Sequence, residues 1–405
     1  MPLQAETIGR PAPASSHRLP ARVRVAVLAD MLEERWPSMD LVADSLVREF
    51  TAQPELGIDP LLVRPRLLRV TAPWRRAADA IPTKERVLNR FWLYRRSLPR
   101  AAQADLFHVV DHSYAHLVTH LAPAQSIVTC HDIDAFADCG QASGRASGLP
   151  AFLVRRLIGG LQQAAMIVCP SESTAEALVG SGLTSRSRVA VVHNGVDIAP
   201  VPALRATEVT RDILGAAGHS IDLLHVGSAI PRKRLDILLE VFARVGRVVP
   251  AARLIRVGGP LTAEQETMAT GLNVRHRIVV LPSLDRETLA AVYSRAALLL
   301  TTSEREGFGL PIVEALAAGT PVIASDLPVF REVAGEAATY VPLEDIDGWA
   351  EQIVSHLIER GEQPDAWRRR QLNAMRRGAL FSWSRHAREV AAVYRRVLGD
   401  CGKEP

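Results

Sequence analysis

Short apolar runs that alternate with longer helical patterns constrain the fold of this 405-residue chain more than any other feature. Runs this rich in β-branched residues are typical of strands that are buried on both faces of a parallel sheet. Helices must then cover both faces, so we predict an α/β protein built from doubly wound units. The predicted strands cover 23–30, 106–111, 126–132 and 166–171 in a first series, and 222–227, 253–258, 277–281, 297–302 and 321–325 in a second.

A stretch with Pro, Ala and Arg at 198–211 interrupts this rhythm, and a chain of this length suits two domains better than one core. We predict a flexible tail at 1–20, a first Rossmann-like domain at 21–205, a second at 206–378 and a final helix at 379–400. By its periodicity alone, that helix packs either on its own domain or back on the first. Two such domains bring the carboxyl ends of their strands to the two sides of a cleft, where sheets of this kind bind ligands.

Composition bounds the class of protein. The apolar fraction is 48%, ordinary for a soluble protein, no apolar run reaches the length of a membrane span, and the first residues lack the apolar core of a secretion signal. Four cysteines without a pairing pattern predict reduced thiols in a cytoplasmic protein. The net charge of +4 suits anionic ligands or an anionic membrane surface. The fingerprints of dehydrogenases and of phosphate-loop hydrolases do not occur.

The segment 303–326 reads as a strand, a glycine turn that opens a helix, and a second strand. Free backbone N–H groups and the positive end of the helix dipole make such a turn an anion site. Gly307 and Gly309 allow close approach of a ligand. Glu306 precedes the helix and Glu314 lies about a turn into it, so carboxylates flank the anion site on both sides. A sugar nucleotide, with phosphates in the middle and hydroxyls at both ends, fits this arrangement.

Glu306 and Glu314, separated by seven residues that include Gly-Phe-Gly-Leu-Pro, resemble the signature of retaining glycosyltransferases of the GT-B fold, family 4. The resemblance runs over about 23–398; an ordinary helix start in an α/β protein is the alternative. It implies two Rossmann-like domains that face a cleft, with the donor bound mostly by the second. It also implies that the final helix at 379–400 crosses back to the first domain. It further implies that Glu306 contacts the donor sugar and Glu314 the ribose. The amides that the resemblance assigns to the diphosphate are those of Gly307, Phe308, Gly309 and Leu310.

The stretch 225–236 is similar to the family's second signature, in which a lysine binds the donor diphosphate. Lys233 falls on that lysine, whereas Ser228 stands where many relatives carry arginine, and Arg232 and Arg234 are both candidates to replace it. Fixed cations lower the barrier as the diphosphate leaves. A solvated basic turn is the alternative. The resemblance also places Gly227, Ser228, Arg232, Gly258, Leu281 and Ser283 around the donor.

On the first domain, His131 matches the family's histidine beside the donor sugar, and a structural histidine is the alternative. His112, His116 and His120 are spaced four apart, as metal ligands on a helix can be, but Ser113 stands where a zinc motif has glutamate. We predict no metal and place His112 near the acceptor. Trp36, which follows a first strand without the relatives' glycine-rich loop, either stacks on an acceptor sugar or anchors its loop.

The segment 84–100 carries aromatic residues among arginines and is predicted as a basic amphipathic helix. Such a helix either lies on an anionic membrane or packs one face in the core with its arginines solvated. No nucleic-acid motif occurs. The prediction is a metal- and cofactor-independent retaining glycosyltransferase for cell-envelope polysaccharide, cytoplasmic or peripheral on the membrane. The phosphate loop and the Gly-Phe-Gly-Leu-Pro turn resemble those of mannosyltransferase-like members, which implies GDP-mannose as the donor, with UDP-sugars next. The expected acceptor is a hydroxyl of a glycan, a lipid-linked sugar or a small molecule. A non-catalytic sugar-nucleotide or glycan-binding protein is the alternative function.

Overall fold

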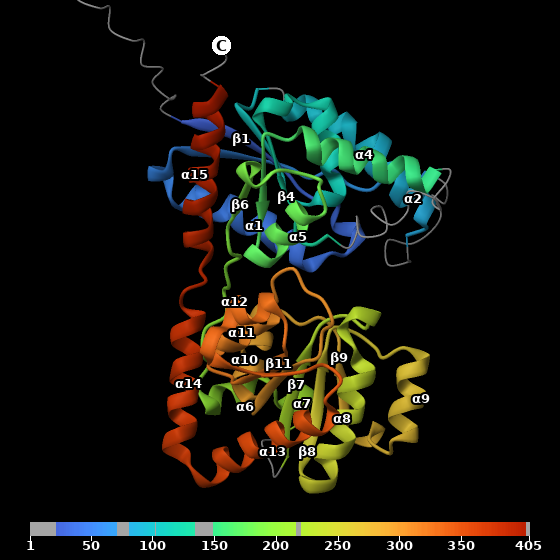
Figure 1. The fold of residues 1–405 in the computed structure, drawn as a ribbon, viewed down its shortest axis with the longest axis vertical. Coiled ribbons are helices and arrows are strands. Elements are labelled where there is room, and N and C mark those ends of the chain that lie inside the picture. The colour runs from blue at the N-terminus through green and yellow to red at the C-terminus, as the bar shows by residue number, and fades with distance from the viewer. Residues whose placement is uncertain (1–21, 71–80, 102, 134–148, 216–219, 402–405) are drawn as a thin grey trace, which may run out of the picture.

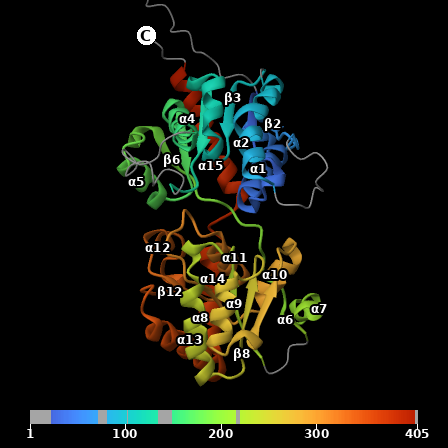
Figure 2. The same cartoon turned by 90° about the vertical axis from the view of Figure 1, so that its right-hand side faces the viewer.

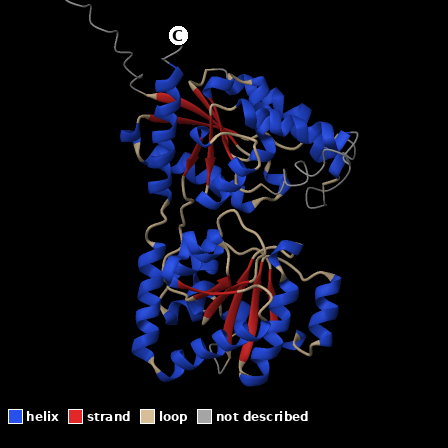
Figure 3. Cartoon of the chain, viewed as in Figure 1, coloured by secondary structure: helices blue, strands red, loops and turns tan. Residues whose placement is uncertain are grey.

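The computed structural model describes residues 22–70, 81–101, 103–133, 149–215 and 220–401, and the predicted tail at 1–20 lies outside them. The described residues form two units, each with a six-stranded sheet between layers of helices (Figure 3). All the strand pairs of both sheets are parallel. The predicted pair of doubly wound sheets is therefore confirmed.

The first sheet has the strand order β2-β1-β3-β4-β5-β6. The strands predicted at its centre are present, but the two edge strands were missed. β2 has Pro60 in its middle, and β6 is only three residues long; both properties weaken a strand's sequence signal. The strands are β1 (Val23–Leu28), β2 (Ile58–Val63), β3 (Leu106–Val109), β4 (Ser126–Thr129), β5 (Met166–Cys169) and β6 (Val189–Val191).

The second sheet has the order β12-β11-β10-β7-β8-β9. Here the missed strand is again at an edge, because β12 is only partly buried and carries Thr and Tyr rather than a continuous aliphatic run. The strands are β7 (Ile221–Val226), β8 (Ala252–Val257), β9 (Ile278–Leu281), β10 (Leu298–Thr301), β11 (Val322–Ser325) and β12 (Ala338–Val341).

Helices cover both faces of each sheet, and α5, α9, α10 and α13 begin with a side-chain cap. The Ser171 side chain accepts from Thr174 N, and Thr262 and Gln265 form a reciprocal capping box. The helices are α1 (Pro37–Ala52), α2 (Thr83–Leu88), α4 (Leu149–Gln163), α5 (Glu172–Gly180), α6 (Ala203–Val209), α7 (Arg211–Leu214), α8 (Leu235–Val248), α9 (Ala263–Gly271), α10 (Arg286–Arg295), α11 (Leu310–Ala318), α12 (Pro328–Ala334), α13 (Ile346–Glu362), α14 (Pro364–Gly378) and α15 (Trp383–Cys401).

The last two helices join the units. α14 lies on the second unit and α15 on the first, along the same edge of the molecule (Figure 1). The apolar face of α15 is buried against β1, β3 and α1, with Trp383, Val390 and Tyr394 in that core. The Tyr394 hydroxyl is 2.7 Å from Nδ1 of His108 in β3. The chain thus passes between the units twice (Figure 2).

The basic segment at 84–100 is not one amphipathic helix. It continues from α2 into a π-helical turn, Asn89–Leu93, and a 3₁₀ stretch, Tyr94–Ala101. Arg90 is not solvated but forms a 2.5 Å ion pair with the buried Glu34. Trp92, in contrast, is 37% exposed. In the described part of the chain, no helix is both long enough and apolar enough to pass through a membrane.

Candidate functional site

The topology of each sheet places one crevice at its carboxyl edge. In doubly wound sheets, ligands bind where the strand order reverses. That point lies between β7 and β10 in the second sheet and between β1 and β3 in the first. The loops after β7 and β10 carry Lys233 and Glu306, which are 73 residues apart in sequence and form an ion pair. The chain therefore brings the two predicted donor motifs together.

A cleft of about 290 Å³ opens between the two units at this place. The second unit contributes Arg232 and Glu306 to its wall, together with the start of α12. The first unit contributes Asp132, which follows β4, and the amino end of α5. The cleft thus has one wall from each unit, as the sequence predicts for a site between two such domains.

Glu306 is the most strongly held carboxylate of the cleft. Lys233 Nζ and Ser303 Oγ both donate to Glu306 Oε1, the latter at 2.7 Å. Arg232 Nη1 donates to Oε2 at 2.8 Å. Burial alone would raise the pKa of Glu306, but the Lys233 and Arg232 cations hold it below its ordinary value. The carboxylate is therefore ionised at neutral pH and neutralises cations that a phosphate would also bind.

The structure also decides between the two neighbouring arginines. Arg232 points toward Glu306, and its Nη1 also donates to the Arg305 carbonyl at 2.8 Å. Arg234 turns away and forms an ion pair with Asp236 at 2.8 Å. Of the two candidates, only Arg232 therefore lies in the cleft.

The turn before α11 meets the first unit directly. Gly307 is buried, and a side chain added there would collide with the His131 carbonyl oxygen. The Gly307 carbonyl accepts hydrogen bonds from Ser171 Oγ at 2.7 Å and Thr174 Oγ1 at 2.9 Å. Gly307, predicted as a donor contact, is thus also a contact between the units.

The other residues of this turn contribute through the backbone. The Phe308 ring packs in the core against Phe381, so only its main chain is available to a ligand. Gly309 caps α11 with a φ of 91°, a conformation that glycine adopts without strain. Leu310 begins the helix. The helix start is formed as predicted, with the dipole of α11 directed at this turn.

Glu314 lies within α11 and accepts a 2.7 Å hydrogen bond from the Tyr293 hydroxyl of α10. Burial raises the pKa of Glu314 to about 7, although this hydrogen bond and the charge of Arg286 lower it. Its partners are thus on α10, whereas those of Glu306 are Lys233, Arg232 and Ser303. The two glutamates therefore face different partners, in keeping with the different parts of a ligand that the sequence assigns to them.

The glycines after β7 and β8 pack against each other. A Cβ at Gly258 would collide with the Gly227 carbonyl, so glycine is required at that position. Beneath them lies Arg256, which donates to Gly227 O at 3.3 Å and also to Gly259 O. Arg256 is one of two arginines in the strand predicted at 253–258, and the sequence assigned no role to its side chain.

Leu281 and Ser283, both predicted around the donor, differ in their availability to a ligand. The Leu281 carbonyl accepts from both Gly258 N and Gly259 N, at 3.1 and 3.2 Å, and its side chain is in the core. Ser283 is exposed. The end of β9 therefore holds the glycine turn, and only Ser283 of this predicted pair is open to a ligand.

The first unit offers a buried polar cluster at its own switch point. Asp30 follows β1 and Asp111 follows β3. Burial and the nearby Asp111 carboxylate raise the pKa of Asp30. For Asp111, burial is outweighed by His112, His131 and hydrogen bonds from Ser113, which lower its pKa. Asp30 is thus protonated and Asp111 ionised at neutral pH.

The predicted histidines lie beside this cluster. His131 is buried, and its Nε2 donates to the Val110 carbonyl at 2.7 Å. Its backbone N–H donates to His112 Nδ1 at 3.3 Å, so the proton of a neutral His112 is on Nε2. That nitrogen is 3.8 Å from Asp132 Oδ1 at the cleft wall. His112 therefore links the buried cluster to the cleft.

Trp36, predicted for the acceptor, is 49% exposed at the start of α1.

The three evenly spaced histidines diverge. They belong to a 3₁₀ helix, His112–His120, in which residues four apart do not share a face. His116 stacks on Phe91 and His120 is 3.1 Å from Arg156. Within the described residues, no three His, Cys, Asp or Glu side chains are grouped so as to hold a metal ion.

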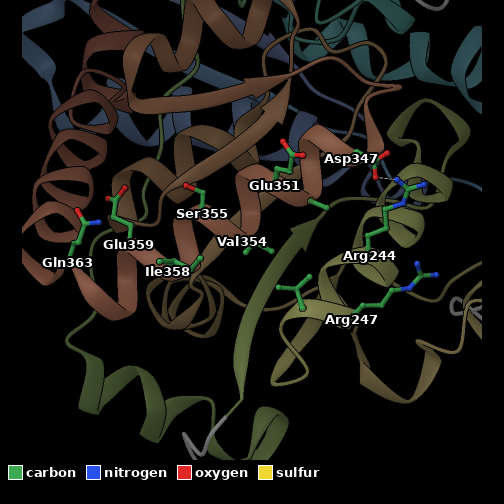
Figure 4. A pocket seen from close by; sticks show the side chains of 11 residues that line it. Arg244, Arg247, Asp347, Glu351, Val354, Ser355, Ile358, Glu359 and Gln363 are labelled. Atoms are coloured by element: carbon green, nitrogen blue, oxygen red, sulfur yellow. Dashed lines mark hydrogen bonds and ion pairs between the residues drawn. The ribbon is translucent and has the colours of Figure 1, made fainter.

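A larger hollow, of about 660 Å³, lies between α8 and α13 (Figure 4). Arg244 and Asp347 form an ion pair across it, and Val248, Ile358 and Glu351 line it. It contains none of the residues that the sequence assigns to the donor or acceptor. The interdomain cleft, although smaller, is therefore the candidate site.

Comparison with known proteins supports this assignment. A family model described as Glycosyltransferase Family 4 matches residues 21–200, and one described as Glycosyl transferases group 1 matches residues 207–373. The D-inositol 3-phosphate glycosyltransferase of Mycolicibacterium smegmatis is 32% identical over 284 residues, which are 67% of this chain and 62% of the relative. That of Mycobacterium sp. strain KMS is 34% identical over 286 residues, with coverages of 67% and 61%. The chain thus spans less than two thirds of the length of these relatives.

Solved structures share the fold. Sucrose-phosphate synthase from Thermosynechococcus elongatus superposes with a TM-score of 0.69 and 21% identity, over 94% of this chain and all of that one. Anabaena HepE in complex with UDP and glucose gives a TM-score of 0.67 and 15% identity, over 95% of this chain and all of that one. The two family models lie on the two units and leave little of the described chain unmatched. The chain is a member of the family 4 glycosyltransferases, with the GT-B fold.

Proposed function

We propose that the protein is a retaining glycosyltransferase that moves a sugar from a nucleoside-diphosphate sugar to an acceptor hydroxyl. The observation that carries the proposal is the cluster of Lys233, Arg232 and Glu306 at the interdomain cleft. Two cations at the switch point of a parallel sheet, beside a helix start, suit a diphosphate. A carboxylate at the same place suits the hydroxyls of the attached sugar.

In the proposed reaction, Lys233 and Arg232 stabilise the charge that develops on the departing diphosphate. Glu306 moves from these cations to the donor sugar, and Glu314 holds the ribose hydroxyls. The acceptor enters from the first unit, along His112 and Asp132, and attacks on the face that the leaving group vacates. The departing phosphate takes the acceptor proton, so the reaction requires no protein nucleophile and no metal. Contact between the units excludes water from the donor.

For the donor we propose GDP-mannose first and UDP-sugars second. The Lys233 loop and the Gly-Phe-Gly-Leu-Pro turn favour GDP-mannose through their resemblance to mannosyltransferase-like members. The complexes of HepE with UDP and with UDP-glucose support a uridine nucleotide instead. The names of the curated relatives support a phosphorylated polyol as one acceptor, and the family resemblance supports glycans of the cell envelope.

The test is a thermal-shift panel with GDP, UDP, ADP and their sugars, followed by donor hydrolysis without acceptor. A competent enzyme raises its melting temperature with one nucleotide and releases sugar slowly. A protein that binds the sugar nucleotide but releases no sugar is the non-catalytic alternative. Retention is checked by NMR of the anomeric proton in the product. Failure to bind any of these nucleotides would refute the proposal.

We also propose that the first unit contacts an anionic membrane through a basic aromatic surface, defined here as Trp92, Arg95, Phe152 and Arg156. Trp92 and Phe152 are 37% and 43% exposed, and the Arg156 guanidinium lies over the Phe152 ring at 5.9 Å. Exposed aromatic side chains among arginines suit the interface of an anionic bilayer. The test is sedimentation with vesicles of phosphatidylcholine, with and without phosphatidylglycerol. Binding only to the anionic vesicles, and its loss in Arg95→Glu/Trp92→Ser, is expected; equal binding to both would contradict it.

A further inference from the structure

Arg256 is a deeply buried cation without an acidic partner. It is the fifth residue of β8, and its side chain is among the largest that are fully buried, at 1% exposure. Its two terminal nitrogens donate to the carbonyls of Gly227 and Gly259. Its Nε has no acceptor. Among the described residues, no carboxylate forms an ion pair with it.

Two partly buried arginines of the described residues have a carboxylate partner, in contrast to Arg256. Arg90 pairs with Glu34 at 2.5 Å, and Arg295 pairs with Asp222 at 2.8 Å. A buried charge without a counter-ion is costly unless another interaction offsets the lost hydration. Burial accordingly lowers the pKa of Arg256, with no carboxylate to raise it. A buried cation that no carboxylate neutralises is suited to stabilise an anionic ligand.

The position of Gly227 connects Arg256 to the candidate site. A Cβ built on Gly227 would be 3.6 Å from Cε of Lys233, while the carbonyl of the same residue accepts from Arg256 at 3.3 Å. Arg256 and Lys233 therefore flank one residue. Arg232 lines the cleft, Lys233 is paired with Glu306 of the cleft wall, and Arg256 is buried behind Gly227.

Arg256 also fixes the orientation of a peptide group. The peptide between Gly227 and Ser228 is trans, as are all the described peptide bonds, and in a trans peptide the C=O and N–H point in opposite directions. Because the carbonyl is directed at Arg256, the N–H of Ser228 points away from it. Ser228 is exposed, and no described residue accepts a hydrogen bond from this N–H. It is therefore available to a ligand in the crevice.

We propose that Arg256 is a positioning residue for the diphosphate of a nucleotide ligand: it directs the Ser228 N–H toward a phosphate oxygen and adds positive charge below it. The inference rests on the proposed function, since the ligand class is the same, and it names a residue outside the two sequence motifs. Preorganised N–H donors and buried charges act strongly on anions because they need no reorganisation when the ligand binds.

The test compares Arg256→Met and Arg256→Lys with the wild type by calorimetry, using the nucleoside diphosphate, UDP or GDP, that the wild type binds more tightly. The matching nucleoside, uridine or guanosine, is titrated in parallel. Loss of a charge-assisted interaction should weaken diphosphate binding about tenfold or more in Arg256→Met. Nucleoside binding should stay within about twofold, because the nucleoside has no phosphate. Arg256→Lys should lie between, since it keeps the charge but cannot hold both carbonyls.

Arg277→Met is the matched control. Arg277 is a partly buried arginine of the same unit that donates to a backbone carbonyl, Gly246 O, and packs over Phe242. The Arg277→Met variant should be less stable than the wild type, but its affinity for the diphosphate should not fall more than its affinity for the nucleoside. Unchanged diphosphate affinity in Arg256→Met, or equal loss for diphosphate and nucleoside, would overturn the inference. If Arg256→Met does not fold, the same comparison in Arg256→Lys decides. A wild type that binds neither UDP nor GDP would instead refute the proposed function.

Discussion

At the scale of single residues, a carboxylate of the protein and the diphosphate of the proposed ligand compete for the same two cations. Glu306 holds Lys233 and Arg232 in one ion-pair cluster. A diphosphate that enters the cleft needs the same two cations, so it must displace the carboxylate. Glu306 would then be released toward the donor sugar. The same side chain thus opposes diphosphate binding and supports the sugar, and these two effects can be separated experimentally.

Glu306→Gln should raise the affinity for a nucleoside diphosphate and lower the rate of transfer. Removal of the competing charge is expected to tighten binding about threefold to tenfold, the range of a partly buried ion pair. Transfer should fall by about tenfold or more, because the amide is a weaker acceptor for the sugar hydroxyls. Calorimetry and product formation measure the two quantities. Glu304→Gln, a half-exposed residue of the same cleft, should change neither, and weaker diphosphate binding in Glu306→Gln would contradict this account.

Glu314 should make donor binding depend on pH. Its pKa is raised to about 7, so it is protonated in acid and becomes a carboxylate as the pH rises through neutrality. The carboxylate is the better acceptor for ribose hydroxyls. Affinity for the donor should therefore increase by up to about tenfold from about pH 6 to about pH 8, following the ionised fraction. The intact nucleotide sugar is the ligand, because its diphosphate has no free terminal phosphate that titrates in this range.

In Glu314→Gln the pH dependence of donor binding should vanish, while part of the affinity for the nucleotide sugar remains. A pH profile that is the same in both proteins would assign the titration to another group. The Tyr293 hydroxyl also donates to Glu314, so Tyr293→Phe should raise the pKa further and shift the rise in affinity to higher pH. Both profiles are obtained from calorimetric Kd values at constant ionic strength.

At the scale of elements, the sequence predicts the buried central strands and the edge strand β9, but it misses the other three edge strands. Central strands such as β4 and β10 are buried at every position and have aliphatic residues at their centres, and their type follows from burial on both faces. β2, β6 and β12 lie at sheet edges or are partly exposed, so their patterns are weaker. The two donor motifs could be paired through the family resemblance and the crevice rule. The role of Arg256 could not be predicted from the sequence, because it depends on how the glycine turns after β7 and β8 pack against its side chain.

The type of a helix is also hard to predict from local sequence. The four-residue spacing of His112, His116 and His120 has one meaning in an α-helix and another in the observed 3₁₀ helix. Local sequence does not distinguish the two, since the packing of this segment against α4 decides it. In contrast, the periodicity of α15 shows an apolar stripe, whereas its position on the first unit was implied only by the family resemblance. Which surface covers an apolar stripe is a tertiary property.

Tyr394 should anchor α15 to the first unit. Its hydroxyl and His108 form a buried hydrogen bond of 2.7 Å, and the ring packs on Phe50. Tyr394→Phe leaves His108 Nδ1 without this partner while the packing stays, so the free energy of unfolding should fall by about 1–3 kcal/mol. Denaturant unfolding measures the change. Arg385→Gln, at an exposed ion pair of the same helix, should stay within about 0.5 kcal/mol, and an equal effect of both variants would contradict the anchor.

At the scale of the whole molecule, the two units touch through polar contacts beside the cleft. Glu332 of α12 accepts from the backbone N–H groups of Glu172 and Ser173, at 2.8 and 3.2 Å, and thereby caps α5 of the other unit. His193 is 2.9 Å from the same carboxylate. Ser171 and Thr174 hold the Gly307 carbonyl. Contacts of this polar kind suit an interface that opens and closes.

Gly307→Ala tests whether this contact is needed for transfer. The added methyl group would collide with the His131 carbonyl, and since both partners are backbone, the units must move apart. Nucleoside-diphosphate binding should persist within about threefold, because Lys233 and Arg232 belong to the second unit. Transfer should fall by about a hundredfold, since acceptor and donor lose their alignment. Small-angle scattering should show a larger radius of gyration, whereas Gly180→Ala, in α5 with open space around it, should behave as the wild type. Wild-type transfer by Gly307→Ala would mean that the contact between the units is not part of the catalytic state.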